Sequence, residues 1–193
     1  MADPPARRAP CRLNTVRFAM SRSLSSPHTP TLYLLCGKIA AGKSTLAATL
    51  AREHNAVIVS EDAWLARLYG PEMHDVADYV RCAARLKEAM TPHLEALLRA
   101  GVSLVLDFPA NTLQSRAWMK TLITTSGAAH ELHWLDVPDA VCLARLRARN
   151  LQGDHDFAAT DAQFAQITRY FVPPDAQEGF NVVAHRGDPG NCA

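Results

Sequence analysis

Short apolar runs alternate with longer amphipathic stretches along most of this chain. The runs are rich in aliphatic and β-branched residues, whereas the longer stretches repeat apolar residues every three or four positions, as helices do. The pattern predicts strands at residues 32–36, 56–60, 102–106, 131–135 and 180–184, and helices at residues 45–52, 62–100, 112–125 and 139–150. Because strands and helices alternate, we expect an α/β domain with a mostly parallel five-stranded sheet between two helical layers.

The composition fits one folded domain with a tail at each end. The chain has 193 residues, of which 48% are hydrophobic, which is enough for a single substantial core. We expect this domain at residues 31–186, with disordered tails at 1–30 and 187–193. The first tail is rich in Arg, Pro and Ser and has no apolar run long enough for a signal peptide or membrane helix. It also resembles an organelle transit peptide, and a start codon misread upstream of Met20 would explain it equally well.

The charge distribution argues against a nucleic-acid partner. The formal net charge is +1, and the first 30 residues carry five arginines against one acid, so the remainder is mildly acidic. A groove for a nucleic-acid backbone would show clustered positive charge instead. We therefore regard a nucleic-acid partner as unlikely and expect no membrane partner.

Cysteines and histidines predict neither a zinc site nor a disulfide framework. The five cysteines are scattered and show no ligand spacing, which favours a reducing, cytoplasmic location. They lie at Cys11, Cys36, Cys82, Cys142 and Cys192. His130 and His133 flank or lie in a predicted strand and are interpreted as structural. Residues 153–156, Gly-Asp-His-Asp, fit no known metal loop and are interpreted as the tip of a lid.

One octapeptide, from Gly37 to Ser44, fits the pattern G-x-x-x-x-G-K-[ST] and lies between a predicted strand and a predicted helix. Glycines let such a loop close its N–H groups around phosphate oxygens, and the helix start favours an anion. Lys43 is expected to reach the β- and γ-phosphates of ATP, and the Ser44 hydroxyl to bind Mg²⁺. The predicted nucleotide-binding residues are Gly37, Lys38, Ile39, Ala40, Ala41, Gly42, Lys43, Ser44 and Thr45.

Two aspartates follow predicted strands, at the edge of a parallel sheet where ligands bind. Asp62 is placed to accept the proton of an attacking hydroxyl, although Asp62 or its neighbour Glu61 would also suit the N-cap of the next helix. Asp107 is placed to face substrate and to hold Mg²⁺ through water or a substrate hydroxyl, although aspartate is also a common turn former. Both carboxylates are candidates for phosphoryl-transfer chemistry.

Arginines supply candidate phosphate ligands. Arg145 and Arg149 are four residues apart, so they share one face of the predicted helix at 139–150, while Arg147 points elsewhere. The pair would stabilise charge on a transferring phosphate, and a solvated basic helix face is the alternative. Arg116 is a candidate for substrate or phosphate binding, or else a surface arginine.

Together these motifs resemble the P-loop kinases. More narrowly, the chain resembles the group that includes zeta toxins, chloramphenicol phosphotransferase and the kinase part of polynucleotide kinase, often labelled AAA-domain predicted kinases. The resemblance covers about residues 31–185 and implies a P-loop NTPase fold with strand order 2-3-1-4-5. It further implies that Asp62 is the base and that Arg145 and Arg149 stabilise the transferred phosphate. The segment 106–112 with Arg116 would face the substrate, as it does in relatives.

The resulting hypothesis is a kinase that uses Mg²⁺ and ATP to phosphorylate a hydroxyl of a small molecule. Residues 62–100 would bind the acceptor and residues 150–172 would form a lid. An apolar acceptor pocket would be lined by Trp64, Tyr69, Met73 and Tyr79, unless these belong to the core. The alternatives are a regulatory NTPase switch, a polynucleotide 5′-hydroxyl kinase and an inactive scaffold. The sequence indicates neither the acceptor nor the oligomeric state.

Overall fold

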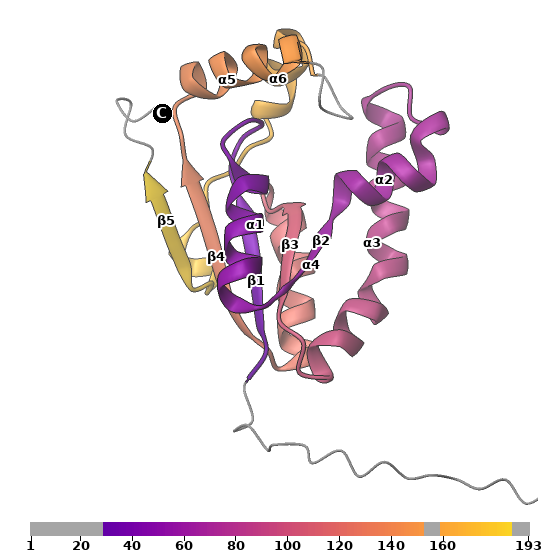
Figure 1. Cartoon of the computed structure of the whole chain (residues 1–193), viewed down its shortest axis with the longest axis vertical. Coiled ribbons are helices and arrows are strands. Elements are labelled where there is room, and N and C mark those ends of the chain that lie inside the picture. The colour runs from indigo at the N-terminus through magenta and orange to yellow at the C-terminus, as the bar shows by residue number, and fades with distance from the viewer. Residues whose placement is uncertain (1–28, 153–158, 187–193) are drawn as a thin grey trace, which may run out of the picture.

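A five-stranded, all-parallel sheet forms the centre of the computed structural model, which describes residues 29–152 and 159–186. The strand order is β2-β3-β1-β4-β5, so the predicted fold class and strand order are confirmed (Figure 1). The strands are β1 (Thr31–Cys36), β2 (Val57–Ser60), β3 (Leu104–Pro109), β4 (Ala129–Asp136) and β5 (Val182–Arg186).

Helices cover the sheet and cross its carboxyl edge. Helix α1 lies on one face, and α3 and α4 lie on the other, while α5 and α6 run across the ends of the strands (Figure 1). The helices are α1 (Lys43–His54), α2 (Glu61–Tyr69), α3 (Val76–Arg99), α4 (Leu113–Ser126), α5 (Asp139–Gln152) and α6 (Asp161–Thr168), with short 3-10 turns η1 (Gly70–Glu72) and η2 (Ala176–Glu178).

The side chains of β1 alternate between the two faces of the sheet, which explains why helices cover both faces. Leu32 and Leu34 point into the core shared with α3 and α4, whereas Tyr33 and Leu35 point into the cluster under α1. Successive side chains of a strand face opposite sides, and all four of these are buried. A strand that is apolar on both sides is stable only in the middle of such a sandwich.

The predicted helix at 62–100 is two helices in the structure. The chain leaves α2 at Gly70 and Pro71, forms the turn η1, and starts α3 again after Asp75. The Asp75 carboxylate caps α3 by accepting a 2.8 Å hydrogen bond from the Asp78 N–H. Pro71 sits at the start of the 3-10 turn, because it lacks the N–H that a continuing α-helix would need.

Helix α6 has no counterpart among the predicted helices. It begins with a capping box, in which Thr160 accepts a hydrogen bond from the Gln163 N–H and the Gln163 side chain accepts one from the Thr160 N–H. Phe164 is its one buried residue, so the helix is too short and too polar to show an apolar period. The predicted lid tip at 153–156, residues 1–28 of the predicted tail at 1–30, and the predicted tail at 187–193 lie outside the described residues.

The described cysteines Cys36, Cys82 and Cys142 are buried free thiols. Cys36 ends β1 directly before the predicted phosphate loop, and burial raises its pKa to about 11. Within the part of the chain that the structure covers, none of the helices combines the length and the apolar character needed to cross a bilayer.

Candidate active site at the P-loop

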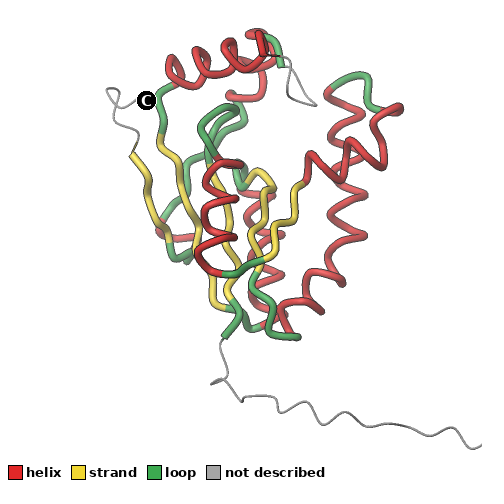
Figure 2. The backbone as a smooth tube through the Cα atoms, viewed as in Figure 1, coloured by secondary structure: helices red, strands yellow, loops and turns green. Residues whose placement is uncertain are grey.

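The loop between β1 and α1 has the backbone shape of a phosphate cradle. Gly42, the N-cap of α1, has φ +105°, and no side chain caps the helix start. A Cβ on Gly37 would lie 3.2 Å from the Leu135 Cβ and 3.3 Å from the Ala41 Cβ, so a larger residue would disturb the loop. Figure 2 shows loop segments gathered between the strand ends and the helices α5 and α6. The uncapped N–H groups at the start of α1 are therefore available to bind an anion.

Lys43 occupies this cradle from the first turn of α1. Its Nζ donates hydrogen bonds to the Gly37 carbonyl at 2.8 Å and the Lys38 carbonyl at 2.9 Å. Burial lowers the pKa of the Lys43 ammonium, and the negative charges of Asp107 and Asp62 oppose this shift. The lysine and both predicted carboxylates therefore lie within electrostatic reach of one another.

Asp62 lies in the first turn of α2 and is not its N-cap. Ser60 caps the helix instead, because its hydroxyl accepts a 3.3 Å hydrogen bond from the Ala63 N–H. Asp62 is half-buried, and its charge opposes the lowering of the pKa values of Lys43 and Arg149 by burial. The capping role therefore belongs to Ser60, and the role of Asp62 toward substrate stays a prediction.

Glu61, the residue directly before Asp62, has a structural role. Its side chain is buried, accepts a 2.8 Å hydrogen bond from the Tyr79 hydroxyl and lies 3.5 Å from the Lys87 Nζ. Burial raises the pKa of the Glu61 carboxyl, and Lys87 and Tyr79 oppose the shift. The pairs fix the start of α2 against α3, and hence the backbone that carries Asp62.

Asp107 lies inside β3, not after its end as the sequence suggested. Leu34 of β1 pairs with Leu106, but Leu35 pairs with Pro109, so the register shifts at Asp107 and Phe108. The pairing of β3 with β2 ends at Asp107, opposite Ser60, and the strand continues past the aspartate because Pro109 pairs with Leu35 of β1. An irregularity of this kind redirects side chains at the edge of a sheet. From this position the negative charge of Asp107 acts on Lys43.

The three arginines of α5 have different surroundings. Arg149 is half-buried, its Nε is buried with no hydrogen-bond partner among the described residues, and burial lowers its pKa while Asp62 opposes this. Arg147 points away and forms an exposed ion pair with Asp161. Arg145 is exposed, and its role toward phosphate stays a prediction. Arg149 is the arginine that the structure brings to the site.

The predicted role of Arg116 in binding substrate or phosphate is corrected by the structure. Its side chain is 0% exposed and pairs with Glu178 at 2.6 Å through Nε and 2.9 Å through Nη2. The remaining donors reach the carbonyls of Ala110, Val172 and Pro173. All five guanidinium donors are used within the protein, so the structure replaces the predicted substrate-binding role of Arg116 with a structural one.

Asn111 is a site residue that the sequence analysis did not single out. Its side-chain oxygen accepts a hydrogen bond from the Gly37 N–H, and its amide nitrogen donates one to the Gly37 carbonyl, each at 2.9 Å. The two residues are 74 positions apart, and no periodic pattern links them. The sequence signals are the position of Asn111 in the turn between a strand and the cap of α4, and its place in the segment 106–112 that the resemblance puts near the substrate.

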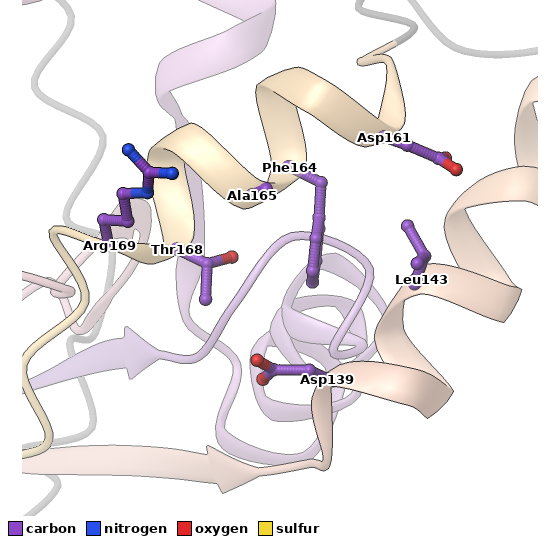
Figure 3. Close-up of a pocket in the computed structure, with 7 residues that line it drawn as sticks. All are labelled: Asp139, Leu143, Asp161, Phe164, Ala165, Thr168 and Arg169. Carbon is purple, nitrogen blue, oxygen red and sulfur yellow. The ribbon is translucent and has the colours of Figure 1, made fainter.

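Lys38 ties the P-loop to α5. Its Nζ forms an ion pair with Asp139 and lies 5.6 Å from the centre of the Phe171 ring. A hollow opens nearby between α5 and α6, and its lining residues are Asp139, Leu143, Asp161, Phe164, Ala165, Thr168 and Arg169 (Figure 3). Asp139 and Asp161 already have cationic partners there, so this hollow offers no phosphate cradle.

The donor set near the P-loop fits Mg²⁺ bound together with a triphosphate. Ser44 is exposed on the first turn of α1, and Asp107 supplies a carboxylate from the adjacent strand. Mg²⁺ commonly takes one or two protein oxygens and completes its shell with phosphate oxygens and water. Among the described residues, no group of three or more histidine, cysteine or acidic side chains is arranged to hold a metal by itself.

Strand order, P-loop and helix arrangement together define a P-loop kinase fold. Residues 32–174 match the AAA domain family, and the chain belongs to that family. Its structure is similar to that of a proposed kinase from Chloroflexus aurantiacus, with 21% identity, a TM-score of 0.67, and coverage of 82% of this chain and 86% of the other.

Two further solved structures share the fold. The APS kinase CysC of Mycobacterium tuberculosis is 17% identical, with a TM-score of 0.56 and coverage of 84% of this chain and 91% of the other. A sugar kinase from Janibacter is 15% identical, with a TM-score of 0.57 and coverage of 82% and 85%. No curated protein matches this sequence. At these sequence identities, the structural similarity shows a shared fold alone.

Proposed function

We propose that this protein is a kinase that transfers the γ-phosphoryl group of Mg-ATP to a hydroxyl group of a small molecule. The observation that carries the proposal is the P-loop at the uncapped start of α1, where Lys43 contacts the Gly37 and Lys38 carbonyls, and the charge of Asp62 acts on both Lys43 and Arg149. Two cations and a carboxylate beside a cradle for anions suit phosphoryl transfer, which depends on positioning and charge stabilisation.

Each residue has a proposed role. The P-loop backbone from Gly37 to Thr45 holds the phosphates, and Lys43 leaves its carbonyl partners to contact them. Ser44 and Asp107 would hold Mg²⁺, which neutralises phosphate charge when it is bound. Arg149, with a buried unpartnered Nε, would contact the transferred group.

In the proposed reaction, Asp62 accepts the proton of the acceptor hydroxyl. The acceptor oxygen forms a bond to the γ-phosphorus, and the bond from that phosphorus to the bridging oxygen breaks, which releases ADP. Asp62 would act from the first turn of α2, whose N-cap is Ser60.

The acceptor side is formed by α2 and α3. Trp64 is 43% exposed and available to a ligand, whereas Tyr69, Met73 and Tyr79 pack against the main core. Tyr79 also holds Glu61. We therefore propose that Trp64 contacts the acceptor and that the other three residues shape the wall behind it. APS kinase and a sugar kinase share the fold, which supports a small acceptor.

A panel experiment tests this function. Purified protein with Mg-ATP is incubated with sugars, nucleosides, amino alcohols, antibiotics and a 5′-hydroxyl oligonucleotide, and products are analysed by mass spectrometry for an added phosphate. We expect one class of small alcohol to be phosphorylated, and Lys43→Ala to abolish the product. Steady ATP hydrolysis that no acceptor changes would instead support the regulatory NTPase, and phosphorylation of the oligonucleotide alone would support the polynucleotide kinase.

A further inference from the structure

Asn111 makes a paired contact with the P-loop that no other described residue duplicates. One hydrogen bond runs from the Gly37 N–H to the Asn111 Oδ1 and the other from the Asn111 Nδ2 to the Gly37 carbonyl, each 2.9 Å long. The pairing needs an acceptor and a donor on one planar group, which only the side-chain amides offer. Aspartate has the shape of asparagine but lacks the donor.

The Gly37 carbonyl serves two donors at once. It accepts from Asn111 and also from the Lys43 Nζ, at 2.8 Å. A carbonyl oxygen has two lone pairs, so both are occupied in this state. Gly37 is buried, and an acceptor left without a partner there would be costly.

Binding of a phosphate changes this arrangement. The contacts with the carbonyls of Gly37 and Lys38 use two of the three N–H donors of the Lys43 ammonium, and we expect Lys43 to turn from these carbonyls toward the anion. Asn111 keeps the Gly37 carbonyl and N–H satisfied while this happens. The loop then has no reason to rearrange around the lost contacts.

The backbone beside Asn111 is held on two sides. The Ala110 N–H donates to the Leu35 carbonyl at 2.9 Å, and the Val172 N–H donates to the Asn111 carbonyl at 2.9 Å. Arg116 adds hydrogen bonds to the carbonyls of Ala110 and Val172. The amide is therefore presented to Gly37 from a fixed support that also includes the segment following α6.

We propose that Asn111 is a positioning residue that keeps the P-loop in its nucleotide-binding shape while Lys43 moves from the Gly37 and Lys38 carbonyls to a phosphate. The inference rests on the proposed function. It adds a residue that does not touch the reacting atoms but sets the affinity for the nucleotide.

The test measures Mg-ATP binding by calorimetry, without any acceptor, in full-length wild type and the variants Asn111→Ala and Asn111→Asp. We expect both variants to bind Mg-ATP about tenfold more weakly or worse, because each leaves the buried Gly37 carbonyl dependent on Lys43. Once an acceptor is known, KM for ATP should rise by about the same factor, while kcat at saturating ATP falls less.

The matched control is Leu122→Ala, which removes a buried side chain from α4. It should lower thermal stability and leave the affinity for Mg-ATP unchanged. Amide hydrogen exchange of residues 37–44 in nucleotide-free protein gives a readout besides binding, and we expect it to accelerate in Asn111→Ala more than in Leu122→Ala.

The outcomes separate the two proposals. If wild type does not bind Mg-ATP, the proposed function fails. If wild type binds it and both Asn111 variants bind equally well, the positioning role is overturned and the kinase proposal stands. If Asn111→Ala does not fold, hydrogen exchange of residues 37–44 in nucleotide-free Asn111→Asp decides, since this variant keeps the bond to the Gly37 N–H and loses the donor, while its added negative charge would by itself weaken Mg-ATP binding.

Discussion

At the residue scale, the assignment of Asp62 depends on its neighbour Ser60. Serine is a favoured N-cap, and here its hydroxyl accepts the Ala63 N–H, so α2 needs no carboxylate at its start. Glu61 pairs with Tyr79 and Lys87, whereas the charge of Asp62 acts on Lys43 and Arg149. Glu61 therefore has a structural role, and we propose that Asp62 acts at the site.

Replacing Asp62 with Asn should uncouple catalysis from nucleotide binding. We expect kcat to fall by about 10²- to 10⁴-fold, the usual contribution of a general base. The affinity for Mg-ATP should stay the same or increase, because a negative charge near the phosphates is removed. Steady-state kinetics and calorimetry measure the two effects. The control is Glu88→Gln on the exposed side of α3, and an Asp62→Asn enzyme with normal kcat would remove Asp62 from the mechanism.

The two arginine ion pairs at Arg116 and Arg147 should differ sharply in their effect on stability. Arg116→Ala leaves Glu178 and three carbonyls without their donor in a buried setting, so we expect the free energy of unfolding to fall by about 3–5 kcal/mol. Arg147→Ala breaks an exposed pair with Asp161 and should change stability very little. Urea denaturation checks both, and equal losses in the two variants would contradict the structural role of Arg116.

At the scale of single elements, the regular strands and helices were predictable where an apolar period repeats. The five strands of the sheet were all expected, because each is a short apolar run that ends near polar residues. The break at η1, the helix α6 and the continuation of β3 past Asp107 were missed. Each of these features depends on a local cap, a turn or pairing with another strand. The period of apolar residues along the chain does not reveal such interactions.

Strands β4 and β5 carry a histidine pair that should make stability depend on pH. The His133 Nδ1 lies 2.9 Å from the His185 Nε2, and its Nε2 lies 3.2 Å from Glu131. Burial lowers the pKa of His133 below its ordinary value, with His185 adding to the shift and Glu131 opposing it. The folded state therefore binds fewer protons than the unfolded state in this range.

We expect the free energy of unfolding to be highest above the unfolded pKa of histidine, about 6.5, and to decrease as the pH falls below it. Burial also lowers the pKa of His130, which contributes in the same direction. Urea titrations between about pH 5 and about pH 8 measure the slope, and His133→Gln should flatten it. His93→Gln, on the exposed side of α3, is the control and should keep the wild-type slope.

At the scale of the whole molecule, parallel strands explain why distant residues meet. The P-loop follows β1, Asp62 follows β2 and Asp107 lies near the end of β3, so one edge of the sheet collects them. This much of the site was predictable from strand order alone. The roles of Asn111 and Arg116 were not, because their partners Gly37 and Glu178 are 74 and 62 positions away along the chain.

Mg-ATP should stabilise the folded protein through this shared site. At a ligand concentration of about 100 times Kd, we expect the free energy of unfolding to rise by about 2.7 kcal/mol. Lys43→Met should remove most of the effect, since the P-loop loses its cation. Thermal unfolding with and without nucleotide checks this, and Arg85→Met, on the exposed side of α3, is the control. A wild-type protein that nucleotide does not stabilise would favour the inactive scaffold.

The burial of Cys36 determines how its thiol would react with electrophiles and oxidants. The thiol stands directly before the phosphate loop, yet it is fully buried and its pKa is raised to about 11. At neutral pH almost none of it is thiolate, the form that reacts with alkylating agents and peroxide. Electrophilic inhibitors aimed at a cysteine beside bound nucleotide would find no nucleophile here, and the folded protein should tolerate oxidants that inactivate enzymes with an accessible sulfur at that position.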